Sequence, residues 1–464
     1  MTRPWIAAAA ALTLAMSGLS TPAAAQAAAP HAASAAASTP TTNATTDQAA
    51  KADAVAQASG FKIRPVDDAW RAALPRNAEA ATQAYLDRLP ADVQAKSAAY
   101  WEGGYWMQLW NLLLGLAIAA AFLAGRRAAR LRDWAQRVGR GAVRRDMLFA
   151  GAYLGLSELI SLPLSLYQGW WREQAYGMST QTVVAWFGEW LMATSISVVL
   201  GGLALGGLYA LIRRAGERWW IWGTAAGMGL MTLMVALAPV FIEPLFNTYK
   251  PVEDGPLKRA VLQMAHAVSV PADDVYVFDA SRQTTRISAN VSGLFGSAAV
   301  RLNDNLLRRT SEPEVRAVMG HELGHYVMNH IPKTLALMTL VLAAGFFIAQ
   351  AALQSLLDRF AHRTGVRRVD DVAGLPLLLS VFSVFFALAT PINNTITRTQ
   401  ETEADRFGLA LSHEPHGFAE AQLRLVEYRK ADPGAVEEFV FFHHPSTRHR
   451  ILDAMRYREA MNLP

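Results

Sequence analysis

Six long apolar segments constrain this chain more than any other feature. They lie near residues 107–124, 147–167, 183–211, 219–242, 334–353 and 374–391. Each is long enough to cross a bilayer as a helix, because about 20 apolar residues span its hydrocarbon core. Hydrophobic residues make up 52% of the 464 residues, more than in an average soluble protein. The sequence therefore predicts a multi-pass membrane protein, with four membrane helices in residues 105–242 and a membrane hairpin in residues 334–391.

The residues before the first apolar segment divide into three parts. Residues 1–25 have a basic start, an apolar core and a final run of small residues. This pattern predicts a cleaved signal sequence or, alternatively, an uncleaved first membrane helix. Residues 26–58 are rich in Ala, Ser and Thr and predict a flexible linker. Residues 59–104 are expected to form short polar helices that lead to the membrane.

Arginine is distributed unevenly between the predicted loops. The loops after the first, third and fifth apolar segments are rich in arginine, whereas the short loop 168–182 holds only Arg172. Basic loops stay on the cytoplasmic side. We therefore expect a bacterial-type inner (plasma) membrane, with residues 243–333 and 392–464 on the periplasmic side. These loops also explain the net charge of +5, so no nucleic-acid partner is expected.

The segment 243–333 has local patterns of its own. Residues Pro256 to Val268 have helical periodicity, Val275 to Ala280 predicts a strand, and Ile287 to Asp304 predicts a strand pair. Ser311, Pro313 and Glu314 then form a helix-start signal with a capping box. This segment therefore predicts a small α+β unit.

The predicted helix after Ser311 contains the pattern HExxH. His321 and His325 are four residues apart and share a helix face, so both imidazoles can hold one Zn²⁺. The chain has no cysteine, which leaves His, Asp and Glu as metal ligands. Glu322 can accept a proton from a water on the metal as a general base. His330 lies further along the same predicted helix, and we expect it at the surface or in contact with a ligand.

A zinc protease needs a third protein ligand and one open position. The segment Thr399 to Gly408 is expected to start a helix just past the sixth apolar segment. Glu401 and Asp405 share one face of that helix, whereas Glu403 points nearly opposite. One of the two can bind the metal while the other orients a ligand histidine. Spacing alone leaves that choice open, and a solvated acidic helix start is the alternative.

Several stretches resemble one protein family, in order, over roughly residues 100–460. They are Leu162–Thr182, Glu243–Lys258, Arg301–Leu307, Pro391–Asp405 and His443–Ile451. The chain resembles the type I CAAX prenyl endopeptidases, integral-membrane zinc metalloproteases of the gluzincin group. The resemblance implies a mainly α-helical polytopic membrane protein. It would have a helical membrane barrel and a small α+β zinc metalloprotease domain, split between residues 243–333 and 392–464.

The resemblance also implies which carboxylate binds the metal. Glu401 matches the family's glutamate ligand, so His321, His325 and Glu401 would hold one Zn²⁺ per chain. Asp405 matches the acid that supports these ligands. His444 matches a histidine that helps to hold the oxyanion.

Further assignments also depend on the resemblance. Arg450 matches an arginine that ties its segment to the acidic site. The family's substrate-binding edge strand usually carries Asn-Ala, where this chain has Ser288 at the aligned position and Asn290 two residues on. Alternate residues share a strand face, so both are candidates for substrate binding. Family members usually place the catalytic domain in the cytoplasm, which is the alternative to the periplasmic side.

Together these features predict a membrane-embedded zinc endopeptidase. It would hydrolyse membrane-associated or CAAX-like peptides that add as a strand beside residues 287–293. The expected partners are the lipid bilayer and a peptide or membrane-protein substrate. Glu158 and Glu189 lie in apolar segments, where they would line the family's chamber or form hydrogen bonds between helices. The alternatives are a membrane transporter and a non-catalytic quality-control scaffold, each with a structural zinc site.

Overall fold

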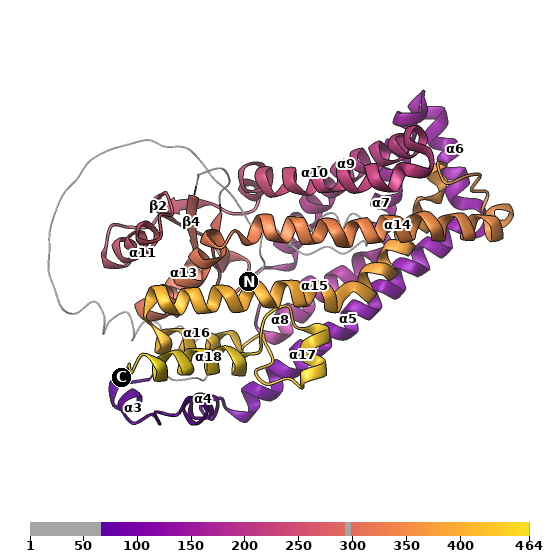
Figure 1. The fold of residues 1–464 in the computed structure, drawn as a ribbon. Helices are drawn as coiled ribbons and strands as arrows, with labels where there is room; N and C mark the ends of the chain where they lie inside the picture. Colours follow the sequence, from indigo (N-terminus) through magenta and orange to yellow (C-terminus); the bar gives the residue numbers. More distant parts are fainter. Residues whose placement is uncertain (1–65, 293–297, 464) are drawn as a thin grey trace.

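The computed structural model describes residues 66–292 and 298–463, which are coloured in Figure 1. The predicted signal sequence (residues 1–25) and linker (residues 26–58) lie outside the described residues. The region that follows contains two short helices, α3 (Asp68–Ala72) and α4 (Ala78–Leu86). Helix α4 packs against the last helix, α18 (Thr447–Ala460). This region therefore supports the soluble domain.

Each of the six apolar segments lies within a long helix. These helices are α5 (Ala91–Leu123), α7 (Ala142–Leu166), α9 (Val183–Ala215), α10 (Trp219–Phe241), α14 (His330–Thr364) and α15 (Leu375–Ser412). Among the described residues, five helical runs are long and apolar enough to cross a membrane, and the run Val183–Leu245 contains both α9 and α10. In Figure 1, α10, α14, α15 and α5 run lengthwise beside one another. The chain is a mainly α-helical, multi-pass membrane protein, as the sequence predicts.

The arginine-rich loops meet at one end of these helices. Helix α6 (Arg127–Gly139) follows the first membrane helix, and its buried Arg132 forms an ion pair with Asp371 in the connection between α14 and α15. Arg126 donates a hydrogen bond of 2.8 Å to the carbonyl of His362, near the end of α14. The sheet and helix α13 lie toward the opposite end of the molecule (Figure 1). The basic loops and the soluble domain are thus separated by the length of the membrane helices.

A four-stranded sheet lies in the segment 243–333. Its strands are β1 (Tyr249–Pro251), β2 (Ala272–Phe278), β3 (Ala289–Ser292) and β4 (Ala298–Asn303). Their order is β1-β2-β4-β3, with β2 and β4 parallel and the other pairs antiparallel. Strand β3 therefore forms one edge of the sheet. Ala289 and Val291 of β3 are buried, so one face of this strand packs into the core.

Further helices complete the soluble domain, and some of them contact the sheet directly. They are α8 (Arg172–Tyr176), α11 (Pro256–Ala267), α12 (Asp304–Arg309), α13 (Glu312–Val327), α16 (Pro415–Leu425) and α17 (Ala435–Phe441), together with α18. A buried cluster joins α11, α13 and the sheet through Val261, Val275, Val300, Leu302 and Leu323. Full burial of each such side chain contributes about 1.5–3 kcal/mol. This cluster holds the helix with the HExxH motif against the sheet.

The prediction that the acidic segment after the sixth apolar segment starts its own helix near Thr399 is wrong. Helix α15 runs from Leu375 to Ser412 without interruption. The hydroxyls of Thr395 and Thr402 donate to carbonyls four residues earlier, at 2.7 and 3.0 Å, so these polar side chains are satisfied within the helix. Glu401 therefore lies on the same rigid helix as the membrane-spanning residues.

Candidate active site

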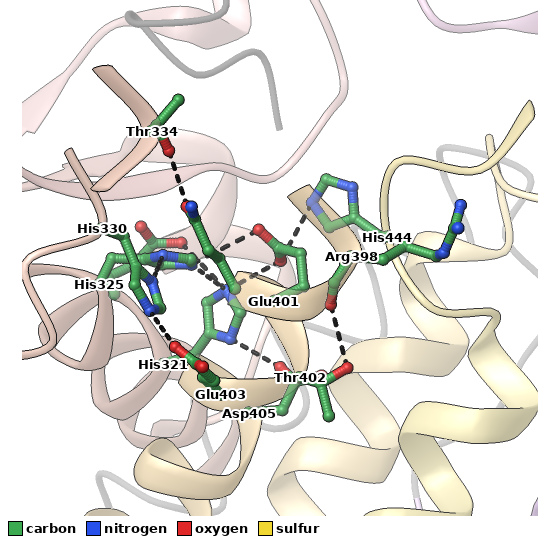
Figure 2. A network of polar contacts seen from close by, with 12 residues as sticks. His321, His325, His330, Thr334, Arg398, Glu401, Thr402, Glu403, Asp405 and His444 are labelled. Carbon is green, nitrogen blue, oxygen red and sulfur yellow. Dashed lines mark hydrogen bonds and ion pairs between the residues drawn. The ribbon is translucent and has the colours of Figure 1, made fainter. Parts of the chain in front are cut away.

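Helix α13 begins as the sequence predicts. The Ser311 N–H donates to the Glu314 carboxylate at 2.7 Å to form the capping box, and Pro313 lies in the first turn. The helix continues through the HExxH motif and ends at Val327. His321 and His325 lie on one face of it, directed toward Glu401 of α15 (Figure 2).

Two glycines let α13 and α15 approach closely at this point. A Cβ atom built on Gly408 would lie 2.6 Å from the backbone nitrogen of His321, and one built on Gly320 would lie 2.8 Å from the carbonyl oxygen of Gly408. Any side chain at either position would push the two helix backbones apart. The close crossing brings the α13 histidines next to Glu401.

The three predicted ligands form one compact group of donor atoms. His321 Nε2 and His325 Nε2 are 3.1 Å apart. Glu401 places one carboxylate oxygen 3.4 Å from His321 Nε2 and the other 3.5 Å from His325 Nε2. Four zinc bonds of about 2.0–2.1 Å at tetrahedral angles put neighbouring donor atoms about 3.3 Å apart. The spacing and the chemistry of this donor set therefore fit a tetrahedral zinc ion.

Asp405 and Arg450 support His321 from behind. Asp405 Oδ1 lies 2.6 Å from His321 Nδ1, and the Arg450 Nε–H donates to Asp405 Oδ2 at 2.7 Å. All three side chains are buried. Burial disfavours a charged His321 ring, but the carboxylates of Asp405 and Glu401 outweigh that effect and raise its pKa to about 9. The negative charge of these carboxylates also favours a bound cation.

His330 supports His325 in the same way, so of its two expected positions the structure shows contact with a predicted ligand and not the surface position. His330 is only 2% exposed, and its Nδ1 lies 2.7 Å from His325 Nδ1 (Figure 2). Its other ring nitrogen, Nε2, lies 2.9 Å from the carboxylate of Glu403. The prediction that His330 lies on the same helix as His321 is wrong, because α13 ends at Val327. Asn329 has a left-handed φ of +55°, and α14 starts at His330.

A bound cation requires neutral ligand histidines, and for that state these contacts define one consistent set of tautomers. An ionised Glu403 accepts the His330 Nε2 proton, which leaves His330 Nδ1 as an acceptor for the Nδ1 proton of His325. Asp405 likewise accepts the Nδ1 proton of His321. Both ligand histidines then direct an Nε2 lone pair at the same point.

Glu322 and His444 lie beside the donor group. Glu322 is 5% exposed, and its Oε1 is 4.0 Å from His321 Nε2. His444 is 3% exposed, and its Nε2 is 3.3 Å from a carboxylate oxygen of Glu401. His444 lies in the loop after α17, and Arg398 donates hydrogen bonds to the carbonyl of Phe439 within this helix, at 3.2 Å, and to that of Phe442 just after it. The structure thus brings both residues to the group formed by the three predicted ligands.

The two candidates for substrate binding lie at the edge of the sheet. Ser288 immediately precedes β3 and lines a small cavity together with His321. Asn290 lies two residues on, within β3. Among the described residues, its buried Oδ1 accepts no hydrogen bond.

The two membrane carboxylates have different surroundings. Glu158 lines a cavity between α5, α7 and α15 together with Ser157 and Ser383. Glu189 instead accepts a hydrogen bond of 3.0 Å from Gln283 and lies 3.6 Å from Arg282. Glu189 therefore joins α9 to the connection between β2 and β3.

Comparisons with known proteins agree with this geometry. Residues 251–458 match the model of peptidase family M48, and residues 73–248 match that of the CAAX prenyl protease N-terminal region with five membrane helices. An uncharacterized metalloprotease of Bacillus subtilis, YhfN, is 30% identical over 307 residues, which cover 66% of this chain and 72% of that protein. CAAX prenyl protease 1 of Saccharomyces cerevisiae is 26% identical over 328 residues, which cover 67% of this chain and 72% of that protein.

A solved structure shows the same fold. The crystal structure of S. mikatae Ste24p superposes with a TM-score of 0.69 at 21% sequence identity, covering 88% of this chain and 95% of that chain. The two family matches follow one another along the chain and together include every residue of the candidate site. The chain therefore belongs to peptidase family M48, within the group of type I CAAX proteases, and is a membrane metalloendopeptidase.

Proposed function

We propose that this metalloendopeptidase binds one Zn²⁺ per chain through His321, His325 and Glu401 and cleaves peptide bonds of membrane-associated substrates. The observation that carries the proposal is the donor group itself, whose ligand atoms all lie within 4.8 Å of one another. Two imidazoles and one carboxylate leave a fourth position open, as catalytic zinc sites require.

The residues around the donor group have distinct roles in this proposal. Zinc at this position supplies a water of lowered pKa and polarises a carbonyl. Glu322 takes the proton from that water and returns it to the leaving amine. His444 donates a hydrogen bond to the oxyanion that develops on the substrate carbonyl. Asp405 and His330 hold the two ligand histidines in place.

We propose that the substrate adds as an extended strand to the free edge of β3. Backbone hydrogen bonds along such an edge bind a peptide with little dependence on its sequence. Ser288 and Asn290 are partly buried and alternate with the buried Ala289 and Val291 along this edge. The yeast relative is named a CAAX prenyl protease, and a CAAX-like peptide is one substrate class that fits this mode. Peptides from membrane proteins are the other.

Two variants are expected to lower zinc affinity, one strongly and one moderately. Glu401→Gln removes a ligand, and we expect the purified protein to hold well under one zinc per chain. His330→Ala removes the partner of His325 and should weaken zinc binding by about 10–100-fold, with one zinc still bound at saturation. The measurement is metal analysis combined with competition against a chelator. Wild-type affinity in both variants would contradict the proposed ligand set.

We also propose that the soluble domain faces the periplasm. The arginine-rich loops gather at the end of the molecule away from the sheet, and basic loops stay in the cytoplasm. The chain has no cysteine, so Asp432→Cys and Arg137→Cys each create a single thiol at an exposed position, on opposite sides of the membrane. A membrane-impermeant maleimide should label Asp432→Cys in intact cells and Arg137→Cys only after lysis. The reverse result would show a cytoplasmic catalytic side.

A further inference from the structure

Helix α17 has one polar face and one exposed apolar face. Val436 and Phe439 are three residues apart on the helix and are 77% and 54% exposed. On the other side, Glu437 accepts a hydrogen bond of 2.8 Å from Tyr105 and forms an ion pair of 2.9 Å with Lys430. The short helix is therefore amphipathic, with Val436 and Phe439 largely exposed and the Arg398 guanidinium 5.9 Å from the centre of the Phe439 ring.

The position of α17 is fixed against two membrane helices. The ring of Phe441 stacks on Tyr105 of α5, with ring centroids 3.9 Å apart. On the other flank, Asn394 of α15 donates to the carbonyl of Val440 at 2.7 Å, and Arg398 donates to that of Glu438 at 2.9 Å. Figure 1 shows α17 beside these two helices. These contacts hold α17 at one height, just beyond the sixth apolar segment.

Through the contact of Phe441 with Tyr105, helix α17 lies next to a lipid-facing band of α5. That band begins one residue after Tyr105 and consists of Trp106, Leu109, Trp110 and Leu113, each more than 40% exposed. Tryptophan at this height marks the membrane–water interface. The apolar surface that α5 presents to the bilayer is therefore next to α17.

We propose that α17 is an interfacial helix whose Val436 and Phe439 insert into the boundary between lipid head groups and acyl chains. Such helices enter this boundary by about 5–10 Å. Two exposed side chains offer far less than the roughly 800 Å² per partner that a stable protein interface buries. The bilayer, which already covers the adjacent band of α5, is the occupant that fits.

This contact ties the catalytic loop to the membrane surface. His444 follows the end of α17 at Phe441 by three residues, and Arg398 binds carbonyls on both sides of that end. Insertion of α17 thus sets the height of the His444 loop above the bilayer. A substrate anchored in the same leaflet meets the site at that height. This consequence rests on the proposed role of His444, whereas the insertion itself does not.

The experiment measures the depth of a single spin label. A nitroxide on Val436→Cys, in nanodiscs of phosphatidylcholine and phosphatidylglycerol, is tested for accessibility to oxygen and to a water-soluble nickel chelate. Leu388→Cys on α15, at a site 76% exposed, is the membrane reference, and Asp432→Cys, three residues before the start of α17, is the aqueous reference. We expect the label at Val436 to favour oxygen over nickel at least several-fold more than the label at Asp432.

Two outcomes would overturn the proposal. One is an oxygen-to-nickel ratio at Val436 equal to that at Asp432. The other is spin–spin broadening at Val436 that disappears on dilution with unlabelled protein, since a second copy would then cover the face. An unchanged melting temperature of the labelled variant shows that the fold is intact. Neither readout depends on zinc or on cleavage, so failure here leaves the proposed function standing.

Discussion

Replacing Glu322 by glutamine is expected to abolish peptide cleavage and to leave zinc binding intact. The amide has the shape of the carboxylate but cannot accept a proton from water. Glu322 lies beside the donor group, 4.0 Å from His321 Nε2, and is not one of its three proposed ligands. Loss of a general base lowers the rate by about 10²–10⁴-fold. The measurement is the cleavage rate of a fluorogenic peptide in nanodiscs, together with zinc content.

Glu312→Gln is the matched control for this variant. Glu312 lies in the first turn of the same helix, and its side chain lies 3.9 Å from Arg316, away from the donor group. We expect wild-type cleavage from it. If Glu322→Gln keeps full activity, Glu322 is not the general base. If this variant no longer binds zinc, Glu322 is a zinc ligand instead.

The second large effect is expected from Gly408→Ala. The added methyl group would lie 2.6 Å from the nitrogen and 2.8 Å from the Cα of His321, both backbone atoms that cannot swing aside. Overpacking of this kind costs about 1–3 kcal/mol. Relief requires α15 to move away from α13, which separates Glu401 from the histidines. We expect a lower melting temperature and a zinc affinity reduced at least tenfold, measured by chelator competition.

Gly104→Ala tests whether the effect comes from the close helix contact. Gly104 lies inside α5, and an added Cβ would meet nothing within 4 Å. Alanine is about 1 kcal/mol more favourable than glycine in a helix, so this variant should be at least as stable as the wild type. Wild-type zinc affinity in Gly408→Ala would show that the crossing of α13 and α15 tolerates a wider spacing.

The membrane helices and the start of α13 could be predicted because their causes are local. A run of about 20 apolar residues has few alternatives to a membrane helix. The capping box at Ser311 and Glu314 satisfies helix-end groups within four residues. The pairing of His321 with His325 follows from helix geometry alone. Each of these features depends on neighbours in the sequence.

The rest of the site depends on contacts between distant segments. The spacing of Glu401 and Asp405 did not show which carboxylate faces the two Nε2 atoms, and only the resemblance assigned them. The contact between His330 and Glu403 was not predicted, because a single left-handed residue, Asn329, turns the chain onto a new helix axis. Asn329 followed by Pro332 is a helix-start signal that could have indicated this break. Glu403 then meets His330 from a segment more than seventy residues away.

The continuity of α15 links the metal centre to the thickness of the bilayer. The helix is 38 residues long, so its axis extends about 57 Å at 1.5 Å per residue, and one rod carries both the lipid-embedded turns and Glu401. The two imidazoles are mounted on α13, outside the membrane. Helices adjust their tilt to the hydrophobic thickness around them. A membrane thickness that changes the tilt of α15 would therefore act on Glu401 as well as on the lipid-embedded turns of the same helix.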